Sequence, residues 1–284
     1  MNAGSREGHL PVPIVGVLGV GSLGREHARV YAALAAEGLV RFGGVFDTDA
    51  RSAREHAHRH GVKAFGSIGE AIEGCDALSI VTPTVTHADL ATRAMAAGRH
   101  ALVEKPMTDT ASSAEALVAM ARERGLVLQV GHVERFNPVF RYLEQAATHP
   151  RFIECHRLSP YPRRSTDIGV VLDLMIHDLD VVLAFVKSPL ESVEAVGIPV
   201  LSRSEDIANA RLRFANGCVA NLTASRISPE RVRKVRVFSG GPAPSYVSLD
   251  YRAQEGFVYR LADEGAEESS LLQKLLRGGD SAII

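Results

Sequence analysis

The amino-acid sequence predicts an α/β protein with two domains: a doubly wound parallel-sheet domain over residues 1–132 and a second α/β domain over residues 133–284. Three observations support this. Up to Gly131, short apolar runs alternate with segments of helical period, as in a parallel sheet. A glycine-rich loop follows the first apolar run directly. Beyond His132 this alternation ends, and from Ser192 onward the predicted elements are mostly strands.

The first domain is expected to bury its strands under helices on both faces, because the apolar runs lack polar alternation. We predict strands at 14–18, 41–46, 77–81, 101–103 and 127–130, separated by helices at 22–37, 49–60, 85–97 and 110–124. The helices are expected to end at Gly38, Gly61, Gly98 and Gly125, since glycine is favoured in the left-handed conformation at a helix C-terminus.

The second domain is predicted to be an open, largely antiparallel or mixed sheet with helices on one face. Helices are expected near 135–147 and 167–187, a strand near 151–158, and further strands at 235–238, 247–249 and 257–259. Apolar alternation over 208–214, followed by Asn216-Gly217 and another apolar run, predicts a hairpin with a type I′ turn. The basic run 231–236 is interpreted as an edge strand protected by charge, with anion binding as the alternative, and the acidic tail 263–268 as a loop.

Composition excludes several classes of protein. The 284 residues include 32 basic and 33 acidic side chains, so there is no electrostatic footprint for nucleic acid. No run of about 18 apolar residues predicts a membrane span, and no signal peptide is evident. Cys75, Cys155 and Cys218 form no Cys-x-x-Cys pair, which favours a reducing cytoplasm over a disulfide framework or zinc ribbon.

Histidines alternate along one predicted helix, at positions 56, 58 and 60. Successive members of this set point about 200° apart and cannot converge on one ion. We therefore predict no metal site here and assign the three histidines to a solvated helix face.

The loop Gly19-Val20-Gly21-Ser22-Leu23-Gly24 joins a predicted strand to a predicted helix, the context in which this pattern binds the pyrophosphate of a dinucleotide. Gly19 is expected to allow the tight turn, Gly21 the approach of the pyrophosphate, and Gly24 the packing of helix on strand. The amides of Ser22 and Leu23 are expected to begin the helix, whose positive end meets the phosphates. The first domain is therefore predicted to be of the Rossmann type.

Asp47 ends the second predicted strand, 23 residues beyond Gly24. A carboxylate at this place accepts hydrogen bonds from the adenine ribose and repels a 2′-phosphate, which favours NAD over NADP. Arg51 nearby could accommodate a phosphate instead, so NADP remains the alternative. Asp47 could also serve as the N-cap of the helix beginning near Asp49.

Two further positions carry candidate chemistry. Lys105 follows a predicted parallel strand, at the edge where ligands bind in such sheets, and Pro106 restricts the backbone beside it. Asp173 and His177 are four residues apart on a helix and share one face, so the carboxylate can orient the imidazole as a general base. The alternatives are a solvated lysine and a surface pair, the latter disfavoured by the apolar surroundings.

Five motifs occur in an order that resembles the GFO/IDH/MocA oxidoreductases, NAD(P)-dependent dehydrogenases of sugars and polyols. They are the glycine loop, Thr82-Pro83 with His87, Glu104-Lys105-Pro106, the string Gly-His-Val-Glu-Arg-Phe-Asn-Pro at 131–138, and Asp173-x-x-x-His177. The resemblance implies that Thr82, Pro83, His87, Glu104 and Lys105 contact the cofactor. It also implies that nicotinamide lies between Lys105 and the Asp173/His177 pair, and that the second sheet mediates a homodimer or homotetramer.

The strings at 131–138, 173–178 and 206–214 are similar to the branch containing UDP-N-acetylglucosamine 3-dehydrogenases, which supply a 3-keto sugar nucleotide to a transaminase in lipid A assembly. The expected reaction is oxidation of the 3-hydroxyl of a UDP-linked amino sugar, with Lys105, Asp173 and His177 catalytic. The family usually continues with another helix and strand beyond the position of Ile284, so the second domain is expected to be truncated at its C-terminus.

The substrate is expected to be held by Lys105, His177, Arg135, Asn137, Arg163 and Arg164, since arginine forks match phosphate geometry. Arg163 and Arg164 could instead be merely solvated, because they lie in a proline-containing loop. Two other functions stay open: an inositol, polyol or free-sugar dehydrogenase on the same fold, and a nicotinamide-binding regulator without turnover.

Overall fold

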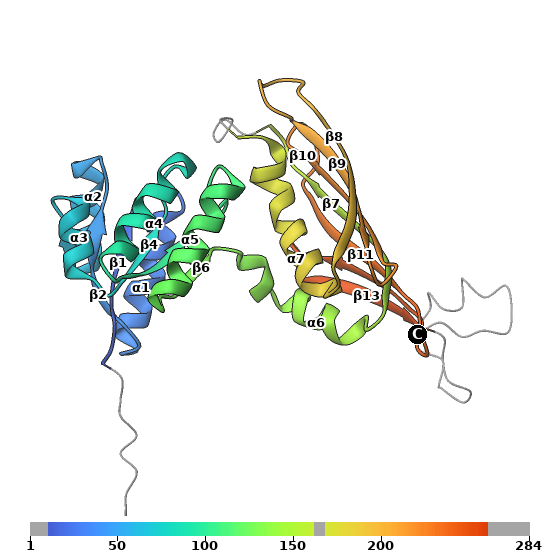
Figure 1. Ribbon diagram of the computed structural model, residues 1–284, viewed down its shortest axis with the longest axis horizontal. Helices are drawn as coiled ribbons and strands as arrows, with labels where there is room; N and C mark the ends of the chain where they lie inside the picture. Colours follow the sequence, from blue (N-terminus) through green and yellow to red (C-terminus); the bar gives the residue numbers. More distant parts are fainter. Residues whose placement is uncertain (1–10, 162–167, 261–284) are drawn as a thin grey trace, which may run out of the picture. The chain divides into compact units, whose positions relative to one another are not determined.

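The computed structural model describes residues 11–161 and 168–260, and the chain divides into two compact units (Figure 1). Unit 1 spans residues 1–131 and unit 2 spans residues 132–284. The predictions for Arg163, Arg164 and the acidic tail at 263–268 lie outside the described residues. Among the described residues, no helix is both long and apolar enough to cross a membrane.

Unit 1 contains a six-stranded parallel sheet in the order β3-β2-β1-β4-β5-β6. The strands are β1 (Ile14–Leu18), β2 (Arg41–Phe46), β3 (Lys63–Ala64), β4 (Ala77–Ile80), β5 (His100–Val103) and β6 (Leu128–Val130). The strand order reverses direction between β1 and β4. Doubly wound sheets bind ligands at such a switch point, beyond the carboxyl ends of the strands.

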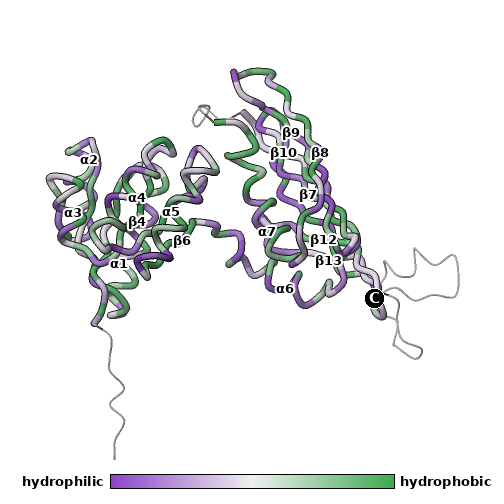
Figure 2. Tube along the Cα trace, viewed as in Figure 1, coloured by the Kyte–Doolittle hydropathy of each residue, from purple (hydrophilic) through white to green (hydrophobic). Residues whose placement is uncertain are grey.

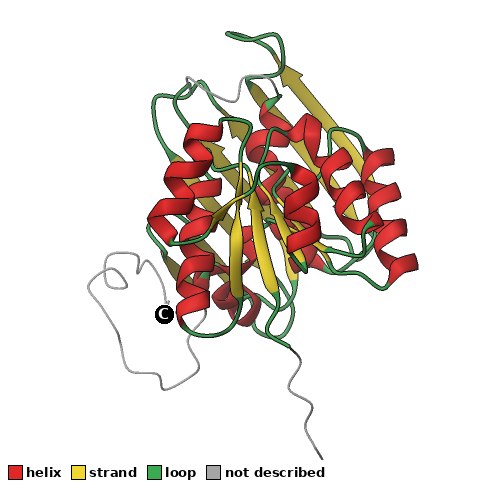
Figure 3. Ribbon diagram, turned by 90° about the vertical axis from the view of Figure 1, so that its left-hand side faces the viewer, coloured by secondary structure: helices red, strands yellow, loops and turns green. Residues whose placement is uncertain are grey.

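Helices cover both faces of this sheet, as Figure 3 shows. They are α1 (Gly24–Ala36), α2 (Ala50–His60), α3 (Ile68–Gly74), α4 (His87–Ala96) and α5 (Ala111–Arg124), with a 3-10 turn, η1 (Thr84–Thr86), before α4. Two separate buried clusters result, one containing Val17 and Val45 and the other containing Leu18 and Ile80. Adjacent residues of β1 therefore serve opposite faces, as expected for a strand buried on both sides.

The prediction of a doubly wound parallel sheet is confirmed, and the five expected strands are present. Gly38, Gly61, Gly98 and Gly125 all have positive φ, at 74°, 65°, 76° and 64°, as expected for helix C-termini. The sequence reasoning missed β3 and α3. β3 has two residues and α3 has seven, so neither is long enough to show a period.

Unit 2 contains a seven-stranded sheet in the order β13-β12-β11-β7-β10-β9-β8. The strands are β7 (Pro150–Leu158), β8 (Leu190–Ile198), β9 (Ile207–Phe214), β10 (Val219–Ser225), β11 (Val232–Ser239), β12 (Ser245–Asp250) and β13 (Glu255–Arg260). All neighbours are antiparallel except β7 and β10. The predicted open, largely antiparallel sheet is therefore confirmed.

The described helices of unit 2 lie on one face of this sheet (Figure 1). They are a 3-10 turn, η2 (Val133–Phe136), then α6 (Pro138–Ala146), a π-helical turn, η3 (Val171–Met175), and α7 (Ile176–Val186). α7 is hydrophobic along most of its length, as Figure 2 shows, and its Val181 and Val182 are buried in the core of unit 2. Among the described residues, the helix expected near 167–187 therefore consists of the π turn η3 followed by α7.

The expectation that the basic run 231–236 forms an edge strand was wrong. The basic run does not form an edge, because β11 pairs with β12 on one side and β7 on the other. One of its charges pairs with the neighbouring strand instead, since Arg236 lies 3.5 Å from Glu154 of β7. The strands at the actual edges are β8 and β13. A strand was predicted at 257–259, within β13, and the sequence analysis named no strand at β8.

The hairpin between β9 and β10 is present, but its turn is not type I′. That turn needs positive φ at both central residues. Gly217 has φ 80°, whereas the non-glycine residues of positive φ in the described ranges are Lys187 and Gln254. The amide of Gly217 donates to the carbonyl of Phe214, which makes a three-residue loop in which only the glycine is left-handed.

The histidines of α2 are also only partly as expected. His56 is buried, at 9% exposure, while His58 is exposed. Residues two apart on a helix point to opposite sides, so the three histidines do not share one solvated face.

Candidate functional site

The glycine loop connects β1 to α1, and the structure separates the roles of its three glycines. Gly19 has φ 87°, and a Cβ there would meet the carbonyl oxygen of Val81. A Cβ on Gly24 would strike the carbonyl oxygen of Gly19. The protein's own packing therefore requires both of these glycines.

Gly21 is different, because a Cβ on it would meet no protein atom within 4 Å, and its φ is not in the left-handed range. Neither packing nor backbone conformation explains glycine here. A ligand approaching the backbone closely does explain it, and this is the expected role of the second glycine in a pyrophosphate-binding loop. α1 begins with Leu23 as N-cap, and the side chain of Leu23 makes no capping hydrogen bond.

A pocket of about 630 Å³ lies beside this loop, within unit 1. Its lining comes from the carboxyl ends of β1, β2 and β4, the expected ligand-binding edge. The residues that line it include Gly19, Gly21, Asp47, Thr48, Thr82, Pro83 and Thr86. The volume and the mixture of apolar walls with few polar groups suit a small-molecule or cofactor site.

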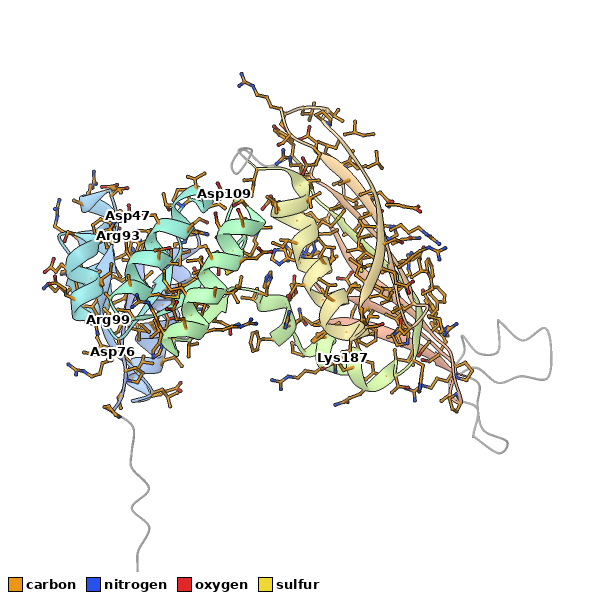
Figure 4. The ribbon with its side chains drawn as sticks, viewed as in Figure 1. Asp47, Asp76, Arg93, Arg99, Asp109 and Lys187 are labelled. Atoms are coloured by element: carbon orange, nitrogen blue, oxygen red, sulfur yellow. The ribbon has the colours of Figure 1, made fainter. Side chains whose placement is uncertain are left out.

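Asp47 follows β2 and lies on the wall of this pocket (Figure 4). Its Oδ2 accepts from the amide of Val20 at 2.8 Å, and its Oδ1 accepts from the amide of Asp49 at 2.9 Å. Asp49, not Asp47, caps α2, by accepting from the amides of Arg51 and Ser52. A carboxylate oxygen can accept two hydrogen bonds, so Asp47 retains capacity for a ribose hydroxyl.

His87 ties together two loops at this edge of the sheet. Its ring is buried, with Nε2 2.8 Å from the carbonyl oxygen of Thr82 and Nδ1 2.9 Å from that of Pro106. It thereby holds the loop after β4 against the loop after β5. Its direct contact with a cofactor stays a prediction, as do those of Thr82 and Pro83, which are more exposed.

Lys105 follows β5 and is half-buried, and its peptide bond to Pro106 is cis. The preceding Glu104 is buried, and its carboxylate accepts a hydrogen bond from the Lys105 amide at 3.1 Å. The other carboxylate oxygen faces His27 of α1. Sequence reasoning did not identify His27, because no local motif links it to Glu104, 77 positions later.

In unit 2, Asp173 and His177 are both half-buried, Asp173 in the π turn η3 and His177 in the first turn of α7. π turns are rare and frequent at functional sites, where they change the direction of side chains within a helix. Glu205, in the connection between β8 and β9, fixes the start of this turn. Its carbonyl and carboxylate accept from the amides of Val170 and Val171 at 2.9 and 3.3 Å.

A buried ion-pair network holds α7 at the residue that follows His177. Arg157 of β7 is buried and binds both oxygens of Asp178, at 3.0 and 2.9 Å. The same guanidinium binds Glu134 of η2 at 3.1 Å. Burial raises the pKa of Asp178, and the positive charge of Arg157 opposes that rise. This buried network fixes the residue next to His177.

Arg135 and Asn137 also make contacts within unit 2. Arg135 binds Asp180 of α7 through two hydrogen bonds, at 2.7 and 2.5 Å. The side chain of Asn137 caps α6 by accepting from Val139, and its amide group donates to Glu134 and to the carbonyl of Tyr251. Both side chains thus have structural roles, and their expected substrate contacts stay predictions.

The glycine loop gives a first testable prediction. Gly21→Ala is expected to lower NADH affinity by about 10-fold or more with little change in the melting temperature, because the added methyl meets ligand and not protein. Gly24→Ala is the matched control: it is expected to lower the melting temperature, because its Cβ strikes the Gly19 carbonyl. Fluorescence titration and thermal unfolding measure both. Unchanged NADH affinity in Gly21→Ala would exclude this loop as the pyrophosphate site.

Comparison with known proteins agrees with this geometry. Residues 14–132 match an oxidoreductase family with an NAD-binding Rossmann fold, and residues 141–239 match the GFO/IDH/MocA C-terminal domain. The UDP-N-acetylglucosamine 3-dehydrogenase of Acidithiobacillus ferrooxidans is 45% identical over 245 residues, covering 86% of this chain and 76% of that protein. The solved structure of that enzyme, GnnA, has a TM-score of 0.82 at 42% identity, over 88% of this chain and 81% of that chain.

A more distant relative is the scyllo-inositol 2-dehydrogenase of Bacillus subtilis, 28% identical over 232 residues, 75% of this chain and 67% of that protein. The two family matches together span most of the chain and include the glycine loop, Lys105, Asp173 and His177. The chain therefore belongs to the GFO/IDH/MocA family of oxidoreductases.

Proposed function

We propose that this protein is an NAD-dependent dehydrogenase that oxidises the 3-hydroxyl of a UDP-linked amino sugar. The observation that carries the proposal is the 45% identity, over most of the chain, to a UDP-N-acetylglucosamine 3-dehydrogenase. The similarity to the inositol dehydrogenase is much lower, at 28%. In the branch that the sequence resembles, the 3-keto product passes to a transaminase in lipid A assembly, and we propose the same destination here.

Three side chains are proposed to carry the reaction. His177 takes the proton of the substrate hydroxyl as general base, and Asp173 orients its imidazole for that task. Lys105 donates a hydrogen bond to the same oxygen and stabilises the negative charge that develops on it. NAD, when bound, supplies the acceptor for the hydride that leaves the carbon.

Residues of unit 1 fit a dinucleotide. A Cβ on Gly21 would meet no protein atom within 4 Å, which leaves space for a closely bound ligand, and the pocket beside it is lined by the loops after β1, β2 and β4. Ser22 and Leu23 place backbone amides at the start of α1 for the phosphates. We further propose that Asp47 selects NAD over NADP, since its carboxylate lies on the pocket wall and would repel a 2′-phosphate.

This selection is testable with one substitution. Asp47→Asn is expected to reduce the preference for NADH over NADPH by about 10-fold, because the repelling charge is removed while an acceptor oxygen remains. Binding titrations with both reduced cofactors measure the ratio. Asp49→Asn is the control, since it removes a charge two residues away and keeps a good helix cap. An equal change in both variants would assign the effect to net charge and not to Asp47.

The substrate assignment is tested by following the absorbance of reduced nicotinamide with each member of a panel. The panel contains UDP-N-acetylglucosamine, free N-acetylglucosamine, myo-inositol and scyllo-inositol, each with NAD and with NADP. Oxidation of the UDP-sugar at far higher kcat/KM than the others supports the proposal. Preference for an inositol would make this a polyol dehydrogenase, and NADH binding without any turnover would make it a nicotinamide-binding regulator.

We also propose that the protein forms a homodimer or homotetramer through the sheet of unit 2. Four rings form a continuous ladder across β7, β11, β12 and β13, with centroids 5.7, 4.8 and 5.5 Å apart between Phe152, Phe238, Tyr246 and Tyr259. Phe257, two residues before Tyr259 on the same face of β13, is 64% exposed. An exposed aromatic surface of this kind is typical of an interface.

Light scattering tests this proposal. Phe238→Glu is expected to convert the oligomer to a monomer, because it places a charge at the centre of the aromatic ladder. Tyr142→Glu is the control, since Tyr142 is an exposed aromatic residue of α6. A wild-type protein that is monomeric, or a Phe238→Glu variant that stays oligomeric, would contradict the proposed interface.

The cytoplasm is the proposed compartment. All three cysteines are free and buried, and burial raises the pKa of the Cys75 and Cys218 thiols to about 11. Thiols held in this state are unreactive and suit a reducing environment.

A further inference from the structure

We propose that His27 is a positioning residue for Lys105, acting through the Glu104 carboxylate. The inference rests on the proposed function, in which Lys105 contacts the reacting oxygen, and it adds a residue that the sequence motifs do not include. His27 lies on α1, three residues beyond the last glycine of the loop. It therefore joins the helix of the cofactor loop to the strand end that bears the lysine.

The contacts form a continuous chain within unit 1. The His27 Nε2 lies 3.0 Å from Oε1 of Glu104, and its Nδ1 lies 2.8 Å from Oγ of Ser79. The second oxygen of Glu104 accepts from the Lys105 amide at 3.1 Å. A single carboxylate thus connects the imidazole to the backbone of Lys105.

The Glu104 carboxylate is enclosed and has little freedom to move. Glu104 is only 6% exposed, and a Cβ on Gly131 would come within 2.5 to 2.8 Å of its carboxylate atoms. A buried carboxylate needs hydrogen-bond donors, because burial without them costs several kcal/mol. His27 and the Lys105 amide supply donors from two directions, which fixes the plane of the carboxylate.

One tautomer of His27 satisfies every group in the chain. With the proton on Nε2, the imidazole donates to Glu104, and its Nδ1 accepts from the Ser79 hydroxyl. Both ring nitrogens of His27 are then hydrogen-bonded, which holds the imidazole in a single orientation.

The arrangement of serine, histidine and glutamate resembles a hydrolytic triad in its connections but cannot act as one. Ser79 lies in β4 and is completely buried, so no acyl group can reach its hydroxyl. The network ends on a backbone amide, that of Lys105. Its geometry points to orientation of the lysine segment and not to nucleophilic attack.

Loss of His27 is expected to affect the chemical step more than cofactor binding. Without the imidazole, Glu104 loses the donor to its Oε1, so the plane of the carboxylate and its bond to the Lys105 amide are fixed from one direction fewer. The lysine segment then occupies several positions, and a displacement of about 1 Å costs up to about 10²-fold in rate. The glycine loop, which requires Gly19 and Gly24 for its own packing, is left intact.

The test uses the 284-residue chain and three variants. In His27→Leu we expect kcat with UDP-N-acetylglucosamine to fall by about 10- to 100-fold while the NADH Kd changes by less than about threefold. His27→Gln, which restores a donor to Glu104, is expected to recover most of the lost kcat. His58→Leu is the matched control, an exposed histidine of α2 in the same unit, and should match wild type.

A second readout does not depend on turnover. Hydrogen exchange at the Lys105 amide is expected to be at least about fivefold faster in His27→Leu than in wild type and in His58→Leu, because its acceptor is released. If the wild type oxidises no UDP-sugar, the proposed function is wrong, and this exchange rate alone decides whether His27 positions the lysine segment. Should His27→Leu fail to fold, Ser79→Ala takes its place, with a smaller loss of kcat and a smaller rise in exchange.

Two outcomes would overturn the inference. One is a folded His27→Leu variant of an active enzyme whose kcat stays within about twofold of wild type. The other is an exchange rate at Lys105 that does not respond to His27→Leu. A His27→Gln variant as impaired as His27→Leu would likewise exclude the hydrogen bond to Glu104 as the cause.

Discussion

The His177→Ala variant is expected to lose turnover by about 10² to 10⁴-fold while it binds NADH with wild-type affinity. This corresponds to about 3 to 5 kcal/mol of activation free energy. The loss follows from the proposed role, because alanine cannot accept the proton of the substrate hydroxyl. The pocket beside the glycine loop is lined by residues of unit 1, and His177 is proposed to contact the substrate hydroxyl, so NADH affinity should be preserved.

Two variants make this result specific. His149→Ala removes an exposed histidine elsewhere in unit 2 and should leave kcat unchanged. Asp173→Asn keeps the size of the side chain but removes the charge that is proposed to orient the imidazole, so its kcat should lie between those of wild type and His177→Ala. Steady-state kinetics and fluorescence titration supply the two measurements. Near wild-type turnover of His177→Ala at neutral pH would remove His177 from the proposed role.

The elements that the sequence predicted well are long enough to show a hydrophobic period or are marked by a local sequence signal. The strands before and after the glycine loop are recognisable because they are apolar and bounded by glycine, and the loop itself has a fixed spacing. The spacing of the loop also predicted that Gly24 serves packing and that Gly21 leaves room for a ligand. The sequence could not identify the atoms that require glycine at the other two positions, the Val81 carbonyl beside Gly19 and the Gly19 carbonyl beside Gly24, because tertiary structure brings them to the loop.

Side-chain partners distant in sequence were beyond the reach of motif reasoning. Arg135 is a natural candidate for phosphate binding, yet its guanidinium pairs with Asp180, 45 residues later. His27, Ser79 and Glu104 come from three separate elements, and none of them lies in a motif with the others. The order of strands in a mixed sheet has the same origin, since β11 reads as an edge strand until β12 and β13 pair beyond it.

Replacement of Arg157 is expected to have the largest effect on stability. Arg157→Met leaves Asp178 and Glu134 without their shared buried cation, and breaking a buried ion pair from one side costs about 3 to 5 kcal/mol. Arg236→Met makes the same change on the neighbouring strand β11. Its pair with Glu154 is partly exposed, so the loss there should be below about 1 kcal/mol. Chemical denaturation measures the free energy of unfolding of both variants.

The cost of Arg157→Met should also depend on pH, with a sign set by Asp178. Burial already raises the pKa of this carboxyl, and loss of the guanidinium raises it further. A group whose folded pKa exceeds its unfolded value stabilises the protein fully below the unfolded pKa, about 4 for Asp, and loses that contribution as pH rises through the folded pKa. The difference in unfolding free energy from wild type should therefore be smaller at about pH 5 than at about pH 7.5.

The same reasoning predicts a rescue. In the Arg157→Met background, Asp178→Asn removes the unpaired charge next to His177 and should recover part of the lost stability at neutral pH. A destabilisation that does not change between the two pH values, or a double variant no more stable than Arg157→Met, would mean that the packing of the arginine and not its charge holds α7. Since α7 carries His177, the two explanations also differ in activity. Loss of charge balance should lower kcat most at high pH, whereas loss of packing should lower it equally at both.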